Sequence, residues 1–210
     1  MKRGIRAELK RKALHLTGLV VPTFYLILGR EFTLYFVAVA FVTFVVLEPF
    51  RIIEGLRDAI KVRLRIINPD VASSVEAIER HIHDIERPHE REGVAAHIYF
   101  TLASLVIVYF FSSRIAVASI SVATVGDALA AIVGKNLGRH RFSNGKSVEG
   151  SLAYLVSGFL IIYSLLGPFA ALAGSLAGTV AEFFNLPPDD NFSNQLTVAI
   201  TLYLLPFLAV

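Results

Sequence analysis

The chain has 210 residues, of which 55% are hydrophobic and 18% charged, and it contains no cysteine. Its mean hydropathy of +0.63 is too high for an ordinary water-soluble domain, so the composition predicts a membrane protein. A helix that crosses the hydrocarbon core needs about 20 residues, and seven such helices would leave about 80 residues for connections. This leaves no room for a large soluble catalytic domain, and the missing cysteines exclude disulfides, thiolate metal ligands and a cysteine nucleophile.

Seven apolar runs are expected to form membrane-spanning helices. In chain order they cover residues 13–29, 32–50, 94–111, 115–134, 151–166, 169–184 and 192–210. The predicted fold is therefore all-α: a single polytopic helix bundle over residues 1–210, with a helical insertion at about 51–93.

Lys and Arg gather on one side of this predicted bundle. If the N-terminus is cytoplasmic, the inner segments are residues 1–12, 51–93, 135–150 and 185–191. All but two of the 20 Lys and Arg residues then lie inside, the exceptions being Arg30 and Arg114. The positive-inside rule thus predicts a cytoplasmic N-terminus and an external C-terminus. Because the outer loops are nearly absent, chemistry on a charged substrate is expected at the cytoplasmic face.

The insertion begins with an amphipathic basic pattern. Apolar residues recur at spacings of three and four between basic ones, at Ile53, Leu56, Ile60, Leu64 and Ile67. Such a helix is expected to lie on an anionic leaflet, with packing against a partner as the alternative. Asn68-Pro69-Asp70 should end it, and Ser73 with Glu76 predicts a capping-box start for a second helix. His81, His83 and His89 are better explained as solvated side chains than as a metal site, because residues two apart do not share a helix face.

Four ionisable residues stand out in or beside the apolar runs: His15, Asp127, Glu149 and Glu182. An ionisable side chain in hydrocarbon costs several kcal/mol unless it meets a partner or a wet cavity, so each is a candidate for function. All four are expected near the cytoplasmic ends of their helices, where they could line one pocket. The alternative is that each extends separately to the interface.

Two of these acids end stripes of small residues at four-residue spacing. One stripe is Ser119, Ala123, Asp127 and Ala131, and the other is Ala170, Gly174, Gly178 and Glu182. Small residues let helices approach closely, which explains the stripes as packing surfaces. Packing alone does not explain the carboxylates.

The segment 134–151 combines glycines with four cations. The cations are Lys135, Arg139, Arg141 and Lys146. Glycines would let backbone N–H groups approach a polyphosphate while the cations neutralise it. The alternative is an ordinary positive-inside loop. A Walker A loop is excluded because His140 stands where that motif needs glycine.

Two further segments carry complementary charge. Asp189, Asp190 and Asn191 offer hard oxygen ligands that suit Mg²⁺, although an acidic turn that caps the last helix is the alternative. Near the N-terminus, Arg11, His15 and Gly18 share a helix face, with Lys12 beside them. This cluster could hold phosphates, or it could serve only as a topology signal.

Taken in order, these segments resemble one enzyme family. They are Arg11-Lys12 with His15 and Gly18, then Gly126-Asp127 through Gly134, then Gly138 through Lys146-Ser147-Val148-Glu149-Gly150-Ser151, then Glu182, and finally Asp189-Asp190-Asn191. The pattern is similar to the CTP-dependent polyprenol kinase family, which includes dolichol kinase, phytol kinase and the CTP-dependent diacylglycerol kinase of fungi. It covers nearly the whole chain, and its central part is the most specific.

The resemblance implies a kinase that transfers the γ-phosphoryl group of CTP to the hydroxyl of a membrane isoprenoid alcohol. The nucleotide site is expected to include Arg11, Lys12, His15, Gly134, Lys135, Gly138, Arg139, Arg141, Lys146, Ser147, Glu149 and Asn191. Asp127, Asp189 and Asp190 are expected to hold Mg²⁺, and Asp127, or else Glu182, to accept the hydroxyl proton. The other expected partners are CTP, the lipid alcohol and the bilayer, with no nucleic acid.

Two other activities compete with this interpretation. A cytidylyltransferase would use the same nucleotide and metal but would join CMP to a lipid phosphate and release pyrophosphate. An ion-coupled transporter would place its acids near the bilayer midplane and would need no nucleotide. The predicted position of the acids near one face disfavours the transporter.

Overall fold

The computed structural model describes residues 10–83 and 94–208, and within these ranges it is helical apart from short connections. Residues 10–16 are helical and continue into the 3-10 helix η1 (Thr17–Leu19). The α-helices that follow are α2 (Val20–Ile52), α3 (Glu54–Ile67), α4 (Pro69–His83), α5 (Ala96–Phe110), α6 (Ser113–Leu137), α7 (Val148–Leu166), α8 (Pro168–Phe184) and α9 (Asp190–Leu208). The predicted all-α class is confirmed.

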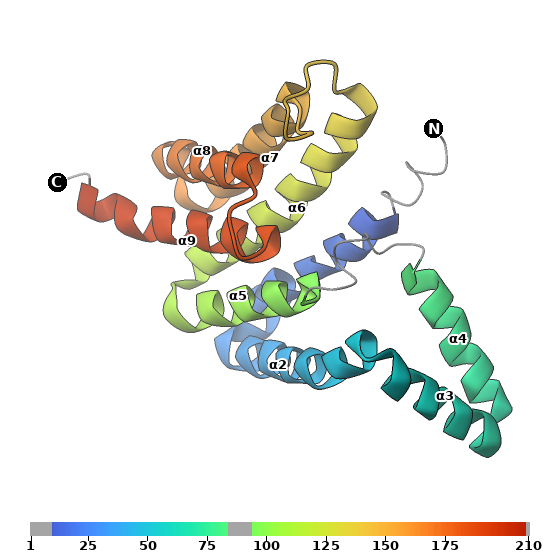
Figure 1. Cartoon of the computed structure of the whole chain (residues 1–210). Helices are drawn as coiled ribbons and strands as arrows, with labels where there is room; N and C mark the ends of the chain where they lie inside the picture. The colour runs from blue at the N-terminus through green and yellow to red at the C-terminus, as the bar shows by residue number, and fades with distance from the viewer. Residues whose placement is uncertain (1–9, 84–93, 209–210) are drawn as a thin grey trace.

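Helix α2 consists of two helical segments that meet at Gly29. This residue has φ 80° and ψ 179°, a conformation that only glycine adopts readily. Figure 1 shows the chain reversing its direction there, so the first two predicted runs form a helical hairpin. The neighbouring Arg30 donates from Nε to the Val108 carbonyl oxygen at 3.1 Å and also to the Tyr109 carbonyl oxygen. It thereby satisfies carbonyls that the end of α5 leaves free.

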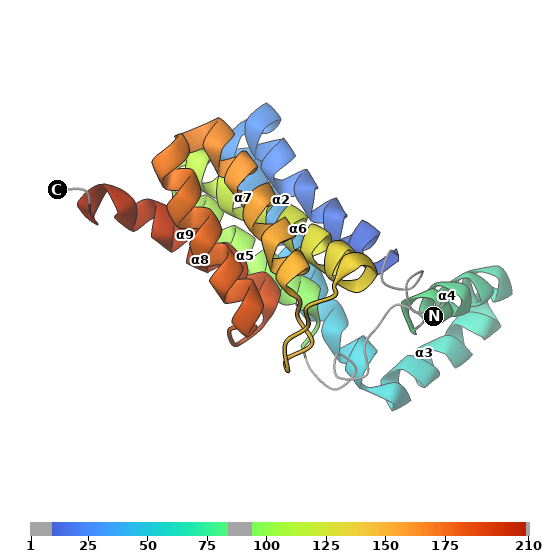
Figure 2. The ribbon, with the colours of Figure 1, turned by 90° about the horizontal axis from the view of Figure 1, so that it is seen from above.

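The connections differ in length between the two ends of the bundle. Gly167, with φ 84°, joins α7 directly to α8, and α5 and α6 are only two residues apart. At the other end lie the longer connections, between α6 and α7 and between α8 and α9 (Figure 2). The sequence predicted short connections at one end of the bundle, and the connections after α5 and α7 are short.

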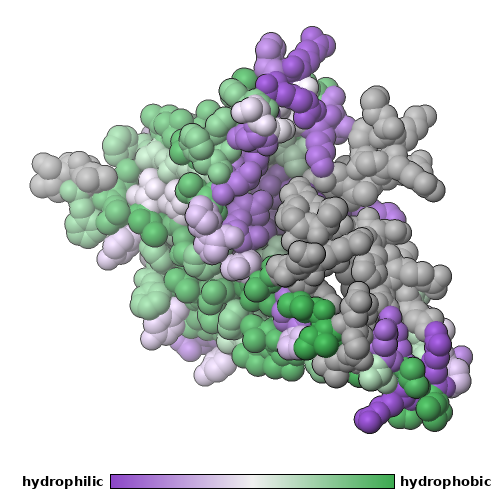
Figure 3. Space-filling model, in the orientation of Figure 1, coloured by the Kyte–Doolittle hydropathy of each residue, from purple (hydrophilic) through white to green (hydrophobic). Residues whose placement is uncertain are grey.

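Three helical stretches are long and apolar enough to cross a membrane by length and composition: Lys10–Phe50, Ser113–Leu137 and Val148–Leu166. Helices α5 and α8 are apolar but shorter. Large apolar side chains remain exposed along the bundle, such as Leu160 (60%) and Phe169 (65%), and hydrophobic residues cover much of the surface in Figure 3. Exposed apolar surface of this extent indicates contact with lipid. Seven spans, and their orientation, stay a prediction.

Helix α6 lies at the centre of the bundle. It packs against α2, α5, α7, α8 and α9, and most of its buried residues are small. Tight contact with α7 follows because α6 presents Ala118, Val122 and Ala130 to the fully buried Tyr154 and Ile162 of α7. Small residues let α6 bring Asp127 close to its neighbours.

The stripe of small residues on α8 is also a packing surface. A Cβ atom added at Gly174 would lie 2.7 Å from Ile162 Cδ1 of α7, and one added at Gly178 would lie 2.8 Å from Val198 Cγ2 of α9. Both distances are too short for carbon atoms. The glycines therefore allow α8 to sit between α7 and α9, with Glu182 one turn beyond Gly178.

Helices α3 and α4 project from the bundle as a separate pair (Figures 1 and 2). Ile66 and Ile67 on α3 are each 79% exposed, so the pair leaves apolar surface uncovered.

The predicted capping box at Ser73 is wrong, because α4 begins at Pro69 and Asn68 Oδ1 accepts from the backbone N–H groups of Asp70 and Val71. Asn68 therefore supplies the cap, five residues before Ser73. The side chains of His81, His83 and His89 lie outside the described part of the structure.

The packing at Gly178 makes a test of the fold. Gly178→Ala should lower the midpoint of thermal unfolding in detergent, by an amount equivalent to about 1–3 kcal/mol, because the added methyl overpacks the contact with α9. Val180→Ala is the control, since Val180 lies on the same helix and is 53% exposed. Equal midpoints for both variants would contradict the described packing.

Candidate functional site

A buried ion pair joins the N-terminal helix to α6. Lys12 Nζ donates to Asp127 Oδ2, and the two side chains are only 5% and 15% exposed. His15 Nε2 lies 3.4 Å from the same carboxylate oxygen. Since Lys12 and His15 are three residues apart, one helix face presents both to Asp127. A buried carboxylate without a partner would be costly, so this pair fixes the N-terminal helix against α6.

Gly18 and Arg11, the other residues of the N-terminal cluster, have different roles in the packing and the charge of the site. Gly18 faces Phe100 of α5, where an added Cβ atom would come within 2.6 Å of Phe100 Cζ. His15 makes an edge contact with the same ring, at a centroid separation of 6.1 Å. Arg11 is close enough for its charge to act on Asp127. Gly18 is therefore a packing residue, while Arg11, Lys12 and His15 surround the carboxylate.

A second buried ion pair joins the α6–α7 connection to α8. Lys146 Nζ donates to Glu182 Oε1, and the Glu182 side chain is only 5% exposed. The second oxygen, Oε2, is buried and has no hydrogen-bond partner among the described residues. Glu182 thus has one oxygen neutralised and one available.

The α6–α7 connection, residues 138–147, folds into a hairpin that aims Lys146 at α8. Phe142 N–H donates to the Lys146 carbonyl oxygen at 2.9 Å, and Gly145 turns the chain with φ 82°. Asn144 Nδ2 donates to the Phe183 carbonyl oxygen at 2.9 Å, which docks the hairpin on the end of α8. The backbone of the hairpin therefore determines where Lys146 points.

Other charged residues of the hairpin are engaged locally. Arg141 Nη2 donates to the Gly134 carbonyl oxygen at 3.0 Å, which caps the end of α6. His140 Nδ1 lies 2.9 Å from Glu149 Oε1, on an exposed side of the hairpin. Lys135, in the last turn of α6, and Arg139, in the connection, are both exposed. Glu149, predicted to join the other three ionisable residues, instead pairs with His140 because it faces the hairpin from the first turn of α7.

The glycines of this connection allow close packing around Ser147. Ser147 caps α7, accepting from the Gly150 N–H group at 3.1 Å. Cβ atoms at Gly134, Gly138 and Gly150 would lie 3.0, 2.8 and 3.1 Å from Ser147 Oγ. The structure thus gives these glycines a packing role, whereas the sequence predicted that they free the backbone for phosphate.

Asp189 caps the start of α9, as one of the two interpretations of the acidic segment predicted. Asp189 Oδ1 accepts from Asn191 N–H at 2.8 Å and from Asn191 Nδ2 at 3.0 Å, while Asp190 Oδ1 accepts from the same Nδ2 at 3.0 Å. Burial raises the pKa of Asp189, and the neighbouring charge of Asp190 raises it further. The Asn191 amide therefore holds together two acids that would otherwise repel each other.

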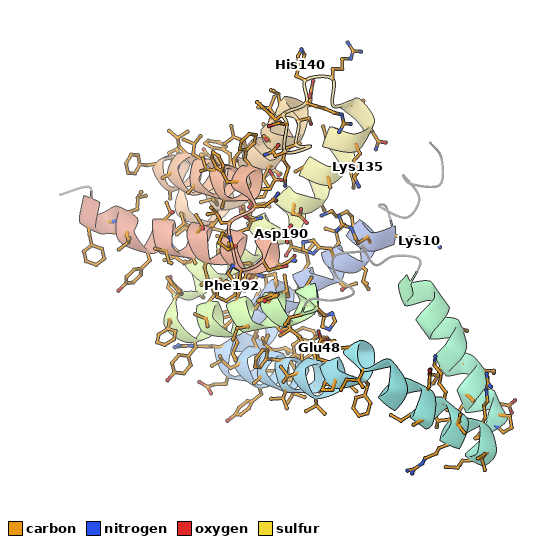
Figure 4. The ribbon with its side chains drawn as sticks, in the orientation of Figure 1. Lys10, Glu48, Lys135, His140, Asp190 and Phe192 are labelled. Carbon is orange, nitrogen blue, oxygen red and sulfur yellow. The ribbon has the colours of Figure 1, made fainter. Side chains whose placement is uncertain are left out.

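These segments converge at one end of the bundle. The charge of Asp190 acts on His15, and the charges of Asp127 and Lys12 act on Glu182. Figure 4 shows Asp190 facing the N-terminal helix, and Figure 3 shows a hydrophilic band from the hairpin over this region between apolar surfaces. The convergence brings together residues from position 12 to position 190 of the chain at one end of the bundle.

Over residues 10–83 and 94–208, no three His, Asp or Glu residues lie close enough to one another to hold a metal ion by themselves. Asp127 and Asp190 nevertheless share the cluster, since the charges of both act on Tyr154. Mg²⁺ usually binds through one or two carboxylates together with substrate phosphates. The oxygen donors therefore suit Mg²⁺ that arrives with a nucleotide better than a metal caged by protein.

Sequence reasoning did not single out Tyr154 or Asn194. Tyr154 is completely buried and Asn194 is 2% exposed, and Tyr154 Oη and Asn194 Oδ1 have no hydrogen-bond partner in the described part of the chain. A tyrosine in an apolar helix is unremarkable in sequence. Asn194 with Gln195 in the last apolar run was a usable signal, because paired amides are costly in lipid.

No family model matches the sequence, and no solved structure matches it. One similar protein is "Uncharacterized protein RP860" of Rickettsia prowazekii, which is 27% identical over 213 residues that cover 96% of each chain.

Other relatives carry kinase names. A probable chloroplastic phytol kinase of Oryza sativa is 31% identical over 63% of this chain and 48% of its own length. A chloroplastic farnesol kinase of Arabidopsis thaliana is 30% identical over 56% of this chain and 44% of its own. A dolichol kinase of Schizosaccharomyces pombe matches over 37% of this chain. The chain spans about half the length of the phytol and farnesol kinases, and the likeness supports a polyprenol-kinase-like family without indicating a specific member.

Proposed function

We propose that the chain is an integral-membrane kinase that phosphorylates the hydroxyl of an isoprenoid alcohol with CTP and Mg²⁺. The observation that carries this proposal is the pair of buried lysine–carboxylate contacts, Lys12–Asp127 and Lys146–Glu182, at one end of an apolar bundle. The kinase names of the relatives support the reaction class. CTP as donor and a polyprenol-type acceptor come from the resemblance of the motifs, and the cationic hairpin supports a cytoplasmic site.

The two ion pairs suit a site that exchanges partners. Each lysine neutralises a carboxylate in the absence of nucleotide, which avoids a buried lone charge. Triphosphate oxygens would compete for Lys12 and Lys146, with Arg139 and Lys135 at the entrance. The carboxylates would then be released toward the metal and the acceptor. Phosphoryl transfer depends mainly on positioning and charge neutralisation, which these groups supply.

Asp127 and Asp190 would hold Mg²⁺, with Asp189 behind Asp190. A Mg²⁺ ion held by these two carboxylates would supply charge neutralisation for the phosphates of the nucleotide. Asn191 bridges the two aspartates and keeps the oxygens of Asp190 oriented.

The proposed reaction forms a bond between the acceptor oxygen and the γ-phosphorus of CTP. The bond between that phosphorus and the bridging β–γ oxygen breaks, and CDP leaves with the electron pair. The hydroxyl proton passes to a carboxylate, for which Asp127 is the first candidate and Glu182 the second. Lys146 and Lys12 hold the phosphates in line for the attack.

The acceptor's hydrocarbon chain would lie against the apolar surface of α7 and α8. An apolar groove of about 200 Å³ lies between α7 and α8, lined by Leu155, Val156, Phe159, Leu160, Leu172 and Ser175. Val156, Leu160 and Leu172 are also exposed along the outside of these helices, as lipid-facing residues are. An isoprenoid chain that enters from the bilayer would contact the helices that carry Tyr154 and Glu182.

Asp127→Asn tests the carboxylate. The amide keeps the shape of the side chain but cannot accept a proton or neutralise a metal, so kcat for CTP-dependent phosphorylation of the alcohol should fall at least about 100-fold. Lys12→Gln is the companion variant, because it breaks the same ion pair but should mainly raise the KM for CTP. Near-normal turnover by folded Asp127→Asn protein would remove Asp127 from the reaction.

Lys146→Ala tests the nucleotide contact. Loss of a charge-assisted contact to phosphate should raise the KM for CTP roughly tenfold or more, measured at saturating alcohol. Lys61→Ala is the matched control, since it removes a positive charge from α3, outside the cluster. If the two variants require the same CTP concentration as the wild type, Lys146 does not bind the nucleotide.

A further inference from the structure

The buried polar atoms without a hydrogen-bond partner among the residues described include one on each of three neighbouring helices: Tyr154 Oη on α7, Glu182 Oε2 on α8 and Asn194 Oδ1 on α9. The three side chains are all more than nine-tenths buried, with exposures of 0%, 4% and 2%. A buried polar group without a partner is destabilising, so three such groups on neighbouring helices require an explanation.

The tyrosine ring occupies a space that glycines leave open. An added Cβ atom would lie 2.8 Å from Tyr154 Cε2 if placed at Gly126 of α6, and 3.0 Å from Tyr154 Oη if placed at Gly178 of α8. The ring is thus held between two helices with its hydroxyl oxygen beside α8. Phenylalanine would fill the same space without the cost of an unpaired hydroxyl, which indicates a use for the oxygen.

Glu182 and Asn194, which carry the other two atoms, lie close in the fold to the contact between Tyr154 and Gly178. Glu182 follows Gly178 by one turn on α8, and its charge acts on Tyr154. Asn194 precedes Val198 by one turn on α9, and Val198 Cγ2 would lie 2.8 Å from a Cβ atom at Gly178. Both residues therefore sit one turn from the Tyr154–Gly178 contact, toward the end of the bundle that carries the ion pairs.

We propose that Tyr154, Glu182 and Asn194 form the binding site for the acceptor's hydroxyl group, an inference that rests on the proposed kinase function. Tyr154 Oη–H would donate to the alcohol oxygen. The alcohol O–H would donate to Glu182 Oε2, and Asn194 Oδ1 is a second acceptor beside it. Lys146 holds the other oxygen of Glu182, which keeps the free oxygen in place.

This site suits an acceptor that carries a hydroxyl group. The two acceptor oxygens, Glu182 Oε2 and Asn194 Oδ1, suit a group that donates a proton, as a hydroxyl does. An ether lacks the proton that Glu182 would accept, and it should bind weakly for that reason.

Tyr154→Phe tests the proposal, because it removes one oxygen and keeps the ring. With detergent-solubilised full-length protein and farnesol as acceptor, we expect the KM for farnesol to rise about tenfold while the KM for CTP stays unchanged. Asn194→Leu should change the same constant in the same direction. Tyr163→Phe is the matched control, since it removes a 53% exposed tyrosine hydroxyl from α7. Unchanged KM values for farnesol in both test variants would overturn the site.

A binding measurement without CTP separates this proposal from the kinase function. Farnesol should raise the thermal midpoint of the wild type more than its methyl ether does, and Tyr154→Phe should abolish that difference. Equal stabilisation by both compounds would overturn the hydroxyl site even if the enzyme phosphorylates farnesol. A difference that depends on Tyr154, without any phosphorylation, would support the site and contradict the kinase function.

Discussion

Charge buried in an apolar bundle must be neutralised, and this constraint organises the end of the molecule described above. Lys12 and Asp127 lie 115 positions apart, and Lys146 and Glu182 come from a hairpin and a distant helix, yet each lysine reaches its acid. Breaking either pair would leave a lone charge in surroundings where it is costly. The pairs therefore fix the N-terminal helix and the hairpin to the bundle. They also hold the charged groups that a phosphorylated substrate would engage.

Close helix contact makes this arrangement possible. Gly126 and Gly178 leave space for the ring of Tyr154, and Gly134 and Gly138 let the hairpin close on Ser147. Larger residues at these positions would separate α6, α7 and α8 and move Asp127 away from Glu182. The small residues of the stripes therefore allow the helices to approach closely. This close approach brings the acids, Asp127 and Glu182, near enough for their charges to interact.

Much of this could be predicted from the sequence, because lipid imposes strong rules. Apolar runs gave the helices and the turn at Gly29, and Asp127, His15 and Glu182 were conspicuous as ionisable groups in those runs. The direction in which each charged side chain points was harder to predict. Glu149 turns toward His140, and Asp189 caps α9, because short-range backbone geometry decides where such side chains point.

Other features depend on packing between distant segments. Lys12 was expected in a cation cluster that could hold phosphates or serve only as a topology signal. Nothing in its neighbourhood in the sequence showed that it would be buried against α6. Tyr154 becomes informative only when α6 and α8 close on it from both sides. A hydroxyl without a partner is a property of the assembled bundle, so only coordinates reveal it.

The most direct measurement follows two differently labelled nucleotides through one reaction. Purified protein in detergent is incubated with an isoprenoid alcohol and with CTP labelled at either the α- or the γ-phosphorus. The charge cluster described here predicts γ-label in the lipid and α-label in CDP. Recovery of the α-label in the lipid would reveal nucleotidyl transfer, and absence of both labels from the lipid would contradict phosphorylation of the alcohol.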